Sequence, residues 1–186
     1  MTDILLKNLS YVKNNKDEFI KGAHLAHERF VFNYGKTFSS TWFYKHYNVT
    51  TLTFGLPLYH KLFVDLQKII REYANKDGPL WYQCWLNFHD ENEVLNRHNH
   101  PQCLFHGYIS IDPKDSETQF DDYTITNEVG NVYIGDGGLF HQVNVLSPFD
   151  GKRITIAFDV MDEESYKKYS SESEKEVNTG WIPIIN

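Results

Sequence analysis

Apolar residues recur at three- and four-residue steps between Leu58 and Tyr73, which is the spacing of an amphipathic helix. Pro57 precedes them, at the first helical turn, where proline is tolerated, and the polar run 75–79 ends the pattern. We therefore predict a helix of roughly five turns that packs one face on a sheet.

The rest of the first 79 residues shows weaker patterns. Residues 16–30 predict a second, less regular helix. Residues 31–54 form an aromatic stretch that predicts irregular structure and ends in a strand-like β-branched run at 49–54. We expect this half to support a sheet formed by the residues that follow.

After Pro79 the pattern changes to short β-branched and aromatic runs separated by turn residues. The predicted strands cover residues 80–88, 102–111, 122–126, 130–134, 139–146 and 153–160. Strands this closely spaced favour a sandwich or barrel over alternating βαβ units. The predicted fold class is mostly β with flanking helices.

The last residues are polar except at the very end. Residues 162–169 predict one short helix, residues 170–180 a solvated segment, and residues 181–185 an apolar end that docks on the body. No repeat or linker divides the chain. We expect a single domain over 1–186, with N-terminal support in 1–79, a β core in 80–160 and a polar C-terminal tail in 161–186.

Composition fits this picture and excludes some functions. The chain has 186 residues, of which 41% are hydrophobic and 16% aromatic, enough for one sizeable core. Its formal net charge of −7 provides no basic surface for nucleic acid or anionic membranes. No signal peptide or membrane span is evident. Cys84 and Cys103 lie in apolar runs and predict buried thiols, so the expected location is the reducing cytoplasm.

Three histidines form the strongest chemical pattern. His98 and His100 are two residues apart, so on an extended segment their side chains share a face and reach one ion. His141 follows 43 residues later, after the glycine-rich turn 135–138, where the backbone can approach a site closely. Three imidazoles on one face suit a transition metal with open coordination positions.

Arg153 suggests that the same site also binds an anion. Arg153 shares one strand face with Thr155, Ala157 and Asp159, and a guanidinium on a pocket wall needs an anion. A dicarboxylate cosubstrate would supply that anion.

This arrangement resembles the iron(II)- and 2-oxoglutarate-dependent dioxygenases. The run Arg97-His98-Asn99-His100-Pro101, with the strand His106-Gly107-Tyr108 behind it, is similar to a branch with a His-x-His-Pro motif. The sequence Arg153-Ile154-Thr155 resembles the Arg-x-Ser that holds the far carboxylate of 2-oxoglutarate. The resemblance covers roughly residues 80–160 and implies a double-stranded β-helix, a jelly-roll or cupin-like barrel.

The resemblance also implies the activity and its cofactors. Fe(II) would be held by His98, His100 and His141, and 2-oxoglutarate by Arg153 and Thr155. We add two residues whose side chains would line the same pocket, Tyr108 and Asn87. The expected function is a dioxygenase that uses O2 to hydroxylate a C–H bond of a peptide side chain or small molecule.

Position 100 departs from the superfamily, which usually has Asp or Glu there. A site of three imidazoles remains possible because neutral nitrogen ligands suit iron. Two other ligand sets stay open: His89 with Glu91, which is itself a His-x-Glu pair, or His100 aided by Gln102 or a water.

Two other functional classes remain. A cupin-type metal enzyme that does not use 2-oxoglutarate has the same order of histidines, although Arg153 then has no role. In a metal-free jelly-roll binding protein the histidines would lie at the rim. The loops at 89–97 and 31–54 are expected to cover the site and to select the substrate.

Overall fold

The computed structural model describes residues 4–34, 47–93, 95–172 and 180–184. The helices are α1 (Ser10–Asn14), α2 (Lys16–Tyr34), α3 (Val49–Thr53), α4 (Pro57–Ala74) and α5 (Glu163–Glu172). The strands are β1 (Leu5–Asn8), β2 (Leu80–His89), β3 (Phe105–Asp112), β4 (Ser116–Phe120), β5 (Thr124–Thr126), β6 (Asn131–Asp136), β7 (His141–Val145), β8 (Arg153–Asp162) and β9 (Ile182–Ile184).

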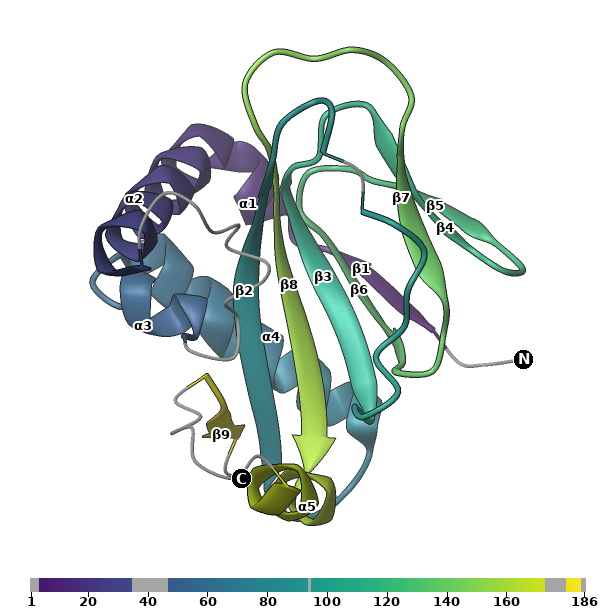
Figure 1. Cartoon of the computed structure of the whole chain (residues 1–186). Coiled ribbons are helices and arrows are strands. Elements are labelled where there is room, and N and C mark those ends of the chain that lie inside the picture. Colours follow the sequence, from purple (N-terminus) through teal and green to yellow (C-terminus); the bar gives the residue numbers. More distant parts are fainter. Residues whose placement is uncertain (1–3, 35–46, 94, 173–179, 185–186) are drawn as a thin grey trace.

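Two sheets face each other (Figure 1). The large sheet has the order β1-β6-β3-β8-β2-β9, and the small sheet has the order β5-β4-β7. Neighbouring strands are antiparallel in both sheets. An isolated bridge between His98 and His141 adds the segment after β2 to the free edge of β7.

The chain passes back and forth between the two sheets. It runs from β2 in the large sheet to the His98 segment beside the small one, returns in β3, crosses to β4 and β5, and returns in β6. It then crosses to β7 in the small sheet and returns to the large sheet in β8. This winding is that of a double-stranded β-helix, which confirms the predicted fold class. Within the described residues, however, the two sheets stay separate and do not close into a hydrogen-bonded barrel.

Helices cover the outer face of the large sheet (Figure 1). In α4 the buried positions Leu62, Leu66 and Ile70 follow the predicted three- and four-residue spacing. Pro57 begins the helix, and Asn75 ends it in the left-handed conformation with φ 41°. These residues share one core cluster with the strand residues Ile156 and Phe158. The predicted packing helix is therefore confirmed.

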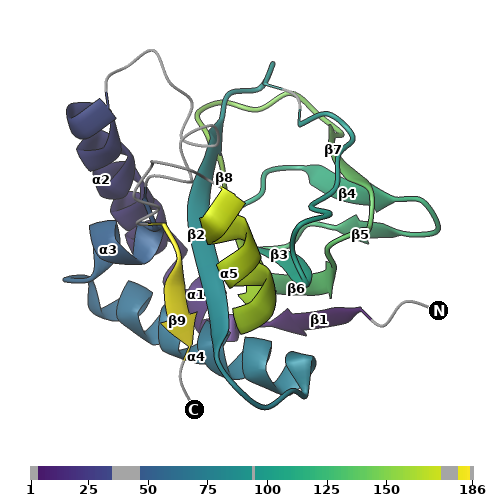
Figure 2. The ribbon, with the colours of Figure 1, turned by 60° about the horizontal axis from the view of Figure 1, so that its bottom comes forward.

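The far edge of the large sheet is completed by the C-terminal residues. Figure 2 shows β9 beside β2 and α5 packed near the same end of the sheet. Trp181 and Ile184 are buried, so the apolar end docks as predicted. The two cysteines are free and buried, also as predicted.

One predicted strand is wrong. Residues 49–53 form α3, because the Asn48 side chain accepts a hydrogen bond from the Thr50 amide and caps a helical turn. This cap outweighs the β preference of Val49 and the threonines. The remaining aromatic residues of that stretch, 35–46, lie outside the described part. The strand β4, between the predicted strands 102–111 and 122–126, was not anticipated.

None of the helices in the described part of the chain is both long and apolar enough to cross a bilayer.

Candidate metal centre and cosubstrate pocket

The two sequence-distant histidines meet through a backbone bridge. The His98 amide donates to the His141 carbonyl oxygen at 3.0 Å, and the His141 amide donates to that of His98 at 2.9 Å. The pairing brings the two ring centroids to 4.3 Å. The His100 amide donates to the Gly137 carbonyl oxygen at 2.8 Å, so His100 is also held next to the start of β7.

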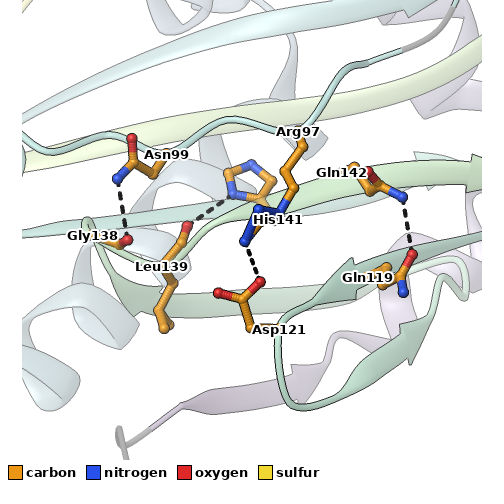
Figure 3. Close-up of polar contacts among 8 residues, drawn as sticks. All are labelled: Arg97, Asn99, Gln119, Asp121, Gly138, Leu139, His141 and Gln142. Carbon is orange, nitrogen blue, oxygen red and sulfur yellow. Dashed lines mark hydrogen bonds and ion pairs between the residues drawn. The ribbon is translucent and has the colours of Figure 1, made fainter.

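Side chains that alternate with His98 and His100 bind this segment to residues next to β4 and β7 of the small sheet (Figure 3). The Asn99 amide group donates to the Gly138 carbonyl at 3.2 Å, and Arg97 pairs with Asp121. The alternating residues therefore hold the segment in place.

His98, His100 and His141 form a cluster suited to a metal ion. One ring nitrogen from each lies within 4.8 Å of the others. In each ring Nδ1 has an oxygen partner: the Asn96 carbonyl at 2.7 Å for His98, the Leu139 carbonyl at 3.3 Å for His141, and the Asp159 carboxylate for His100. An Nδ1–H donated to oxygen leaves the Nε2 lone pair for a ligand. The donor set therefore fits a divalent transition metal.

The local electrostatics favour neutral imidazoles at His98 and His141. Burial, and then the neighbouring His98 and His100, lower the pKa of His141 to about 3. Burial also lowers the pKa of His98. Neutral rings are the form that binds metal.

His106 lies against this cluster. Its ring stacks on those of His100 and His141, with centroids 5.0 Å and 4.5 Å away. Burial, followed by the neighbouring histidines, lowers its pKa to about 2. His106 is thus a neutral residue in the wall of the site.

Arg153 occupies another part of the same pocket. It lies opposite His89 across the β2–β8 pair, and its Nη2 is 2.7 Å from His89 Nδ1. Its side chain is buried, and its Nε has no hydrogen-bond partner among the described residues. Burial lowers the pKa of Arg153 to about 10, which leaves it charged at neutral pH. Glu93 acts on Arg153 electrostatically and raises its pKa, but the described residues show no ion pair between a carboxylate and this guanidinium. A buried guanidinium with an unpartnered Nε calls for an anionic ligand.

His89 serves this guanidinium as an acceptor. Burial, and then Arg153, lower the pKa of His89 to about 4, so the ring is neutral and its Nδ1 can accept from Arg153. Glu91 is exposed, and neither residue belongs to the histidine cluster found among the described residues. The structure therefore does not bring the alternative pair His89 and Glu91 to the cluster.

Thr155 and Asn87 face each other beside Arg153. The Asn87 amide donates to Thr155 Oγ1 at 3.2 Å, which leaves the threonine hydroxyl hydrogen free for a ligand. The Tyr108 hydroxyl is buried without a partner of normal hydrogen-bond geometry in the described chain, and burial raises its pKa. Both hydroxyls can donate to an anion.

One cavity of about 380 Å³ unites these residues. All the residues predicted to bind metal or cosubstrate line it: Asn87, His98, His100, Tyr108, His141, Arg153 and Thr155. Leu95, Asn96 and Arg97 from the predicted covering loop also line it, as does Gln102. Residues 35–46 of the other predicted cover lie outside the described part.

Two contacts were not anticipated from the sequence. His89 was considered only as a metal ligand, yet it holds Arg153. Asp159 was placed on the correct strand face, but its carboxylate contact with His100 Nδ1, at 2.8 Å and 3.1 Å for its two oxygens, was not foreseen. The pairing of β2 with β8 decides the first contact, and the backbone hydrogen bond from His100 to Gly137 helps to decide the second. The sequence pattern alone provides neither.

Comparisons with known proteins agree with the fold. No family model and no curated protein matches the chain. Among solved structures, the chain is similar to the non-heme α-ketoglutarate-dependent epimerase SnoN from nogalamycin biosynthesis, with 10% identity and a TM-score of 0.55 over 87% of this chain and 77% of that one. It is also similar to the carbocyclase SnoK, at 10% identity and a TM-score of 0.56 over 87% of this chain and 80% of that one.

A second SnoN structure, described as a complex with Fe3+, α-ketoglutarate and nogalamycin RO, gives a TM-score of 0.54 at 10% identity, covering 87% of this chain and 79% of that one. α-Ketoglutarate is another name for 2-oxoglutarate. At such low identity the likeness concerns the fold. The predicted fold is thus supported by comparison as well, because this chain shares it with SnoN and SnoK.

Proposed function

We propose that this chain is an Fe(II)- and 2-oxoglutarate-dependent dioxygenase that hydroxylates a C–H bond of a small molecule or peptide side chain. One observation carries the proposal. A single cavity joins three histidines with available Nε2 atoms to a buried arginine whose Nε has no hydrogen-bond partner among the described residues. A metal ion and a dicarboxylate would satisfy these groups together.

The residues have distinct roles in this proposal. His98, His100 and His141 hold the iron, and Arg153 binds the far carboxylate of 2-oxoglutarate through charge-assisted hydrogen bonds. His89 holds the guanidinium in orientation, while Thr155 and Tyr108 donate hydroxyl hydrogens to the same ligand. Iron with 2-oxoglutarate supplies the chemistry, in which O2 is consumed, 2-oxoglutarate becomes succinate and CO2, and one oxygen atom enters the substrate.

The shape of the wall supports a cosubstrate that extends along β8. Between Arg153 and Asp159, the residues on this face are Thr155 and Ala157, both of them small. The protein's contribution is then to orient the cosubstrate and to keep bulk water out.

Hydroxylation is the outcome that we propose, although the fold also serves other reactions. Two of the solved structures similar in fold, SnoN and SnoK, are described as an epimerase and a carbocyclase. A cupin-type metal enzyme without 2-oxoglutarate is a weaker candidate, because it gives the buried Arg153 no ligand. The cytoplasm remains the proposed location.

The test uses anaerobic protein with Fe(II) and 2-oxoglutarate. We expect a weak visible charge-transfer band and, after O2 is admitted, slow succinate formation without substrate. Arg153→Ala should weaken 2-oxoglutarate binding about 100-fold, since it removes a charge-assisted pair, and should leave metal binding intact. His141→Ala should abolish both.

The control is Arg29→Ala, which removes a guanidinium that donates to a backbone carbonyl far along the chain. It should bind 2-oxoglutarate like the wild type. Normal cosubstrate binding by Arg153→Ala would show that the carboxylate assignment is wrong. Metal binding without any dependence on 2-oxoglutarate would favour the cupin, and a protein that binds no metal would be a metal-free jelly roll.

A further inference from the structure

Asp159 is a buried carboxylate next to the metal candidate His100. Its side chain is 1% exposed, and His100 Nδ1 lies 2.8 Å from one carboxylate oxygen and 3.1 Å from the other. Within the described residues, neither lysine nor arginine forms an ion pair with it. A negative charge is therefore enclosed beside an imidazole.

The fold explains this position. Asp159 lies on β8, opposite Gln83 of β2 on one side and His106 of β3 on the other. It points to the same face as Arg153, six residues earlier on the strand, but Arg153 is held by His89 instead. The buried neighbours of the carboxylate also include the thiol of Cys103, which burial and Asp159 keep protonated by raising its pKa. None of these neighbours supplies a positive charge.

A buried carboxylate is unfavourable unless a cation compensates it. An imidazole that donates Nδ1–H to the carboxylate offers one hydrogen bond and presents Nε2 on its far side. A divalent cation on that Nε2 would compensate the charge through the ring. Carboxylate–histidine–metal arrangements of this kind fix the tautomer and raise the basicity of the ligand.

We propose that Asp159 supplies through His100 the negative charge that the superfamily usually places directly on the metal. In this arrangement the His100 imidazole would bind the metal, and the Asp159 carboxylate would lie behind that imidazole instead of on the metal. Asp159 is then a positioning and charge-compensating residue of the metal centre. This inference rests on the proposed function, because it assumes that the three histidines hold a metal ion.

The first experiment measures metal affinity directly. Anaerobic Fe(II), and Co(II) as a spectroscopic probe, are titrated against a competing chelator, and the visible Co(II) bands report the coordination. Asp159→Asn keeps an oxygen that can accept from His100 Nδ1 but removes the charge. We expect it to weaken metal binding 10- to 100-fold.

Asp112→Asn is the matched control. Asp112 is also buried, but it lies at the opposite end of β3 and pairs with Lys16 and Lys114. Its substitution should leave the metal affinity unchanged. If Asp159→Asn binds metal within threefold of the wild type, Asp159 does not compensate the metal and the inference is overturned.

A second experiment separates charge from general damage. His100→Asp restores the usual carboxylate ligand and removes the ring through which Asp159 would act on the metal. Asp159→Asn should therefore weaken metal binding 10- to 100-fold in the wild type but by less than threefold in the His100→Asp background. General structural damage would weaken metal binding equally in both. An equal weakening in both backgrounds would leave Asp159 with a structural role only.

Different results would contradict the proposed metal centre and the proposed role of Asp159. If the wild type binds no metal, or if His141→Ala leaves binding intact, the proposed metal centre is wrong. If the wild type binds metal through His141 and Asp159→Asn does not alter the affinity, only the role of Asp159 is wrong.

Discussion

In each of the histidines His89, His98 and His141, the neighbouring group determines whether Nδ1 donates or accepts a hydrogen bond. The Nδ1 atoms of His98 and His141 face backbone carbonyls two residues earlier, so local geometry selects the tautomer. His89 has the opposite arrangement, because its Nδ1 faces a guanidinium and must accept. Histidines therefore serve two functions here: His98 and His141 present Nε2 to the cavity, and His89 supports the Arg153 that lines it.

A pH measurement tests the role of His89. Its pKa is lowered by burial and Arg153 to about 4, so between pH 6.5 and 4 the unfolded chain binds a proton that the folded protein does not. Stability that is complete above pH 6.5 is thus lost as the pH falls through this window. His89→Gln keeps an acceptor for Arg153 but does not titrate. Between pH 6.5 and 5, its free energy of unfolding should therefore fall by about 2 kcal/mol less than that of the wild type.

Urea unfolding at a series of pH values measures this difference. His60→Gln, at an exposed position, is the control and should keep the wild-type profile. Parallel profiles for the wild type and His89→Gln would contradict a neutral, buried His89.

The strands differ in how far their local pattern predicts them. In β8 the alternation is clear, and the residues predicted to share a face, Arg153, Thr155, Ala157 and Asp159, include three that line the cavity. In α3 the β-branched run misleads, because the Asn48 cap decides the conformation. Periodicity is thus informative where a whole element is buried, and less so over a single turn.

Strand β3 depends on a glycine whose role only packing reveals. A Cβ at Gly107 would lie 2.2 Å from the Tyr133 carbonyl oxygen and 2.3 Å from the Phe158 ring. Gly107→Ala should therefore destabilise the protein by about 3 kcal/mol, because the neighbours must move apart. Thermal or urea unfolding measures the change.

Gly55→Ala is the matched control, since nothing lies within 4 Å of its added Cβ. It should alter stability by less than about 1 kcal/mol. A similar loss for both variants would argue against the close approach at Gly107.

On the scale of the whole molecule, the metal candidates belong to the junction of the two sheets. His98 and His141 lie at the edge of the small sheet, whereas Arg153 and Asp159 lie on the large one. The support from residues 1–79 is integral: β1 extends one edge of the large sheet, and α2 contacts β2 and β3. We therefore propose that the chain unfolds as a single domain, as the sequence predicts.

Denaturation followed by two probes tests this proposal. Tryptophan fluorescence reports partly on Trp85 in the cavity wall, and far-ultraviolet circular dichroism reports the helices. The two transitions should coincide at one urea concentration. Transitions with separate midpoints would show that the N-terminal helices and the β core are independent units.

The sequence by itself determined the strand-rich class, the long packing helix and the residue types of the site. These depend on local spacing: two histidines on one face, and an arginine and a threonine on one strand. The tertiary structure decided which partner each of these residues meets. His89 meets Arg153 only when β2 and β8 pair in one register, which is a property of the whole sheet. Asp159 meets His100 only when the segment of His98 and His100 is bound beside β7, which brings residues far apart in the sequence together.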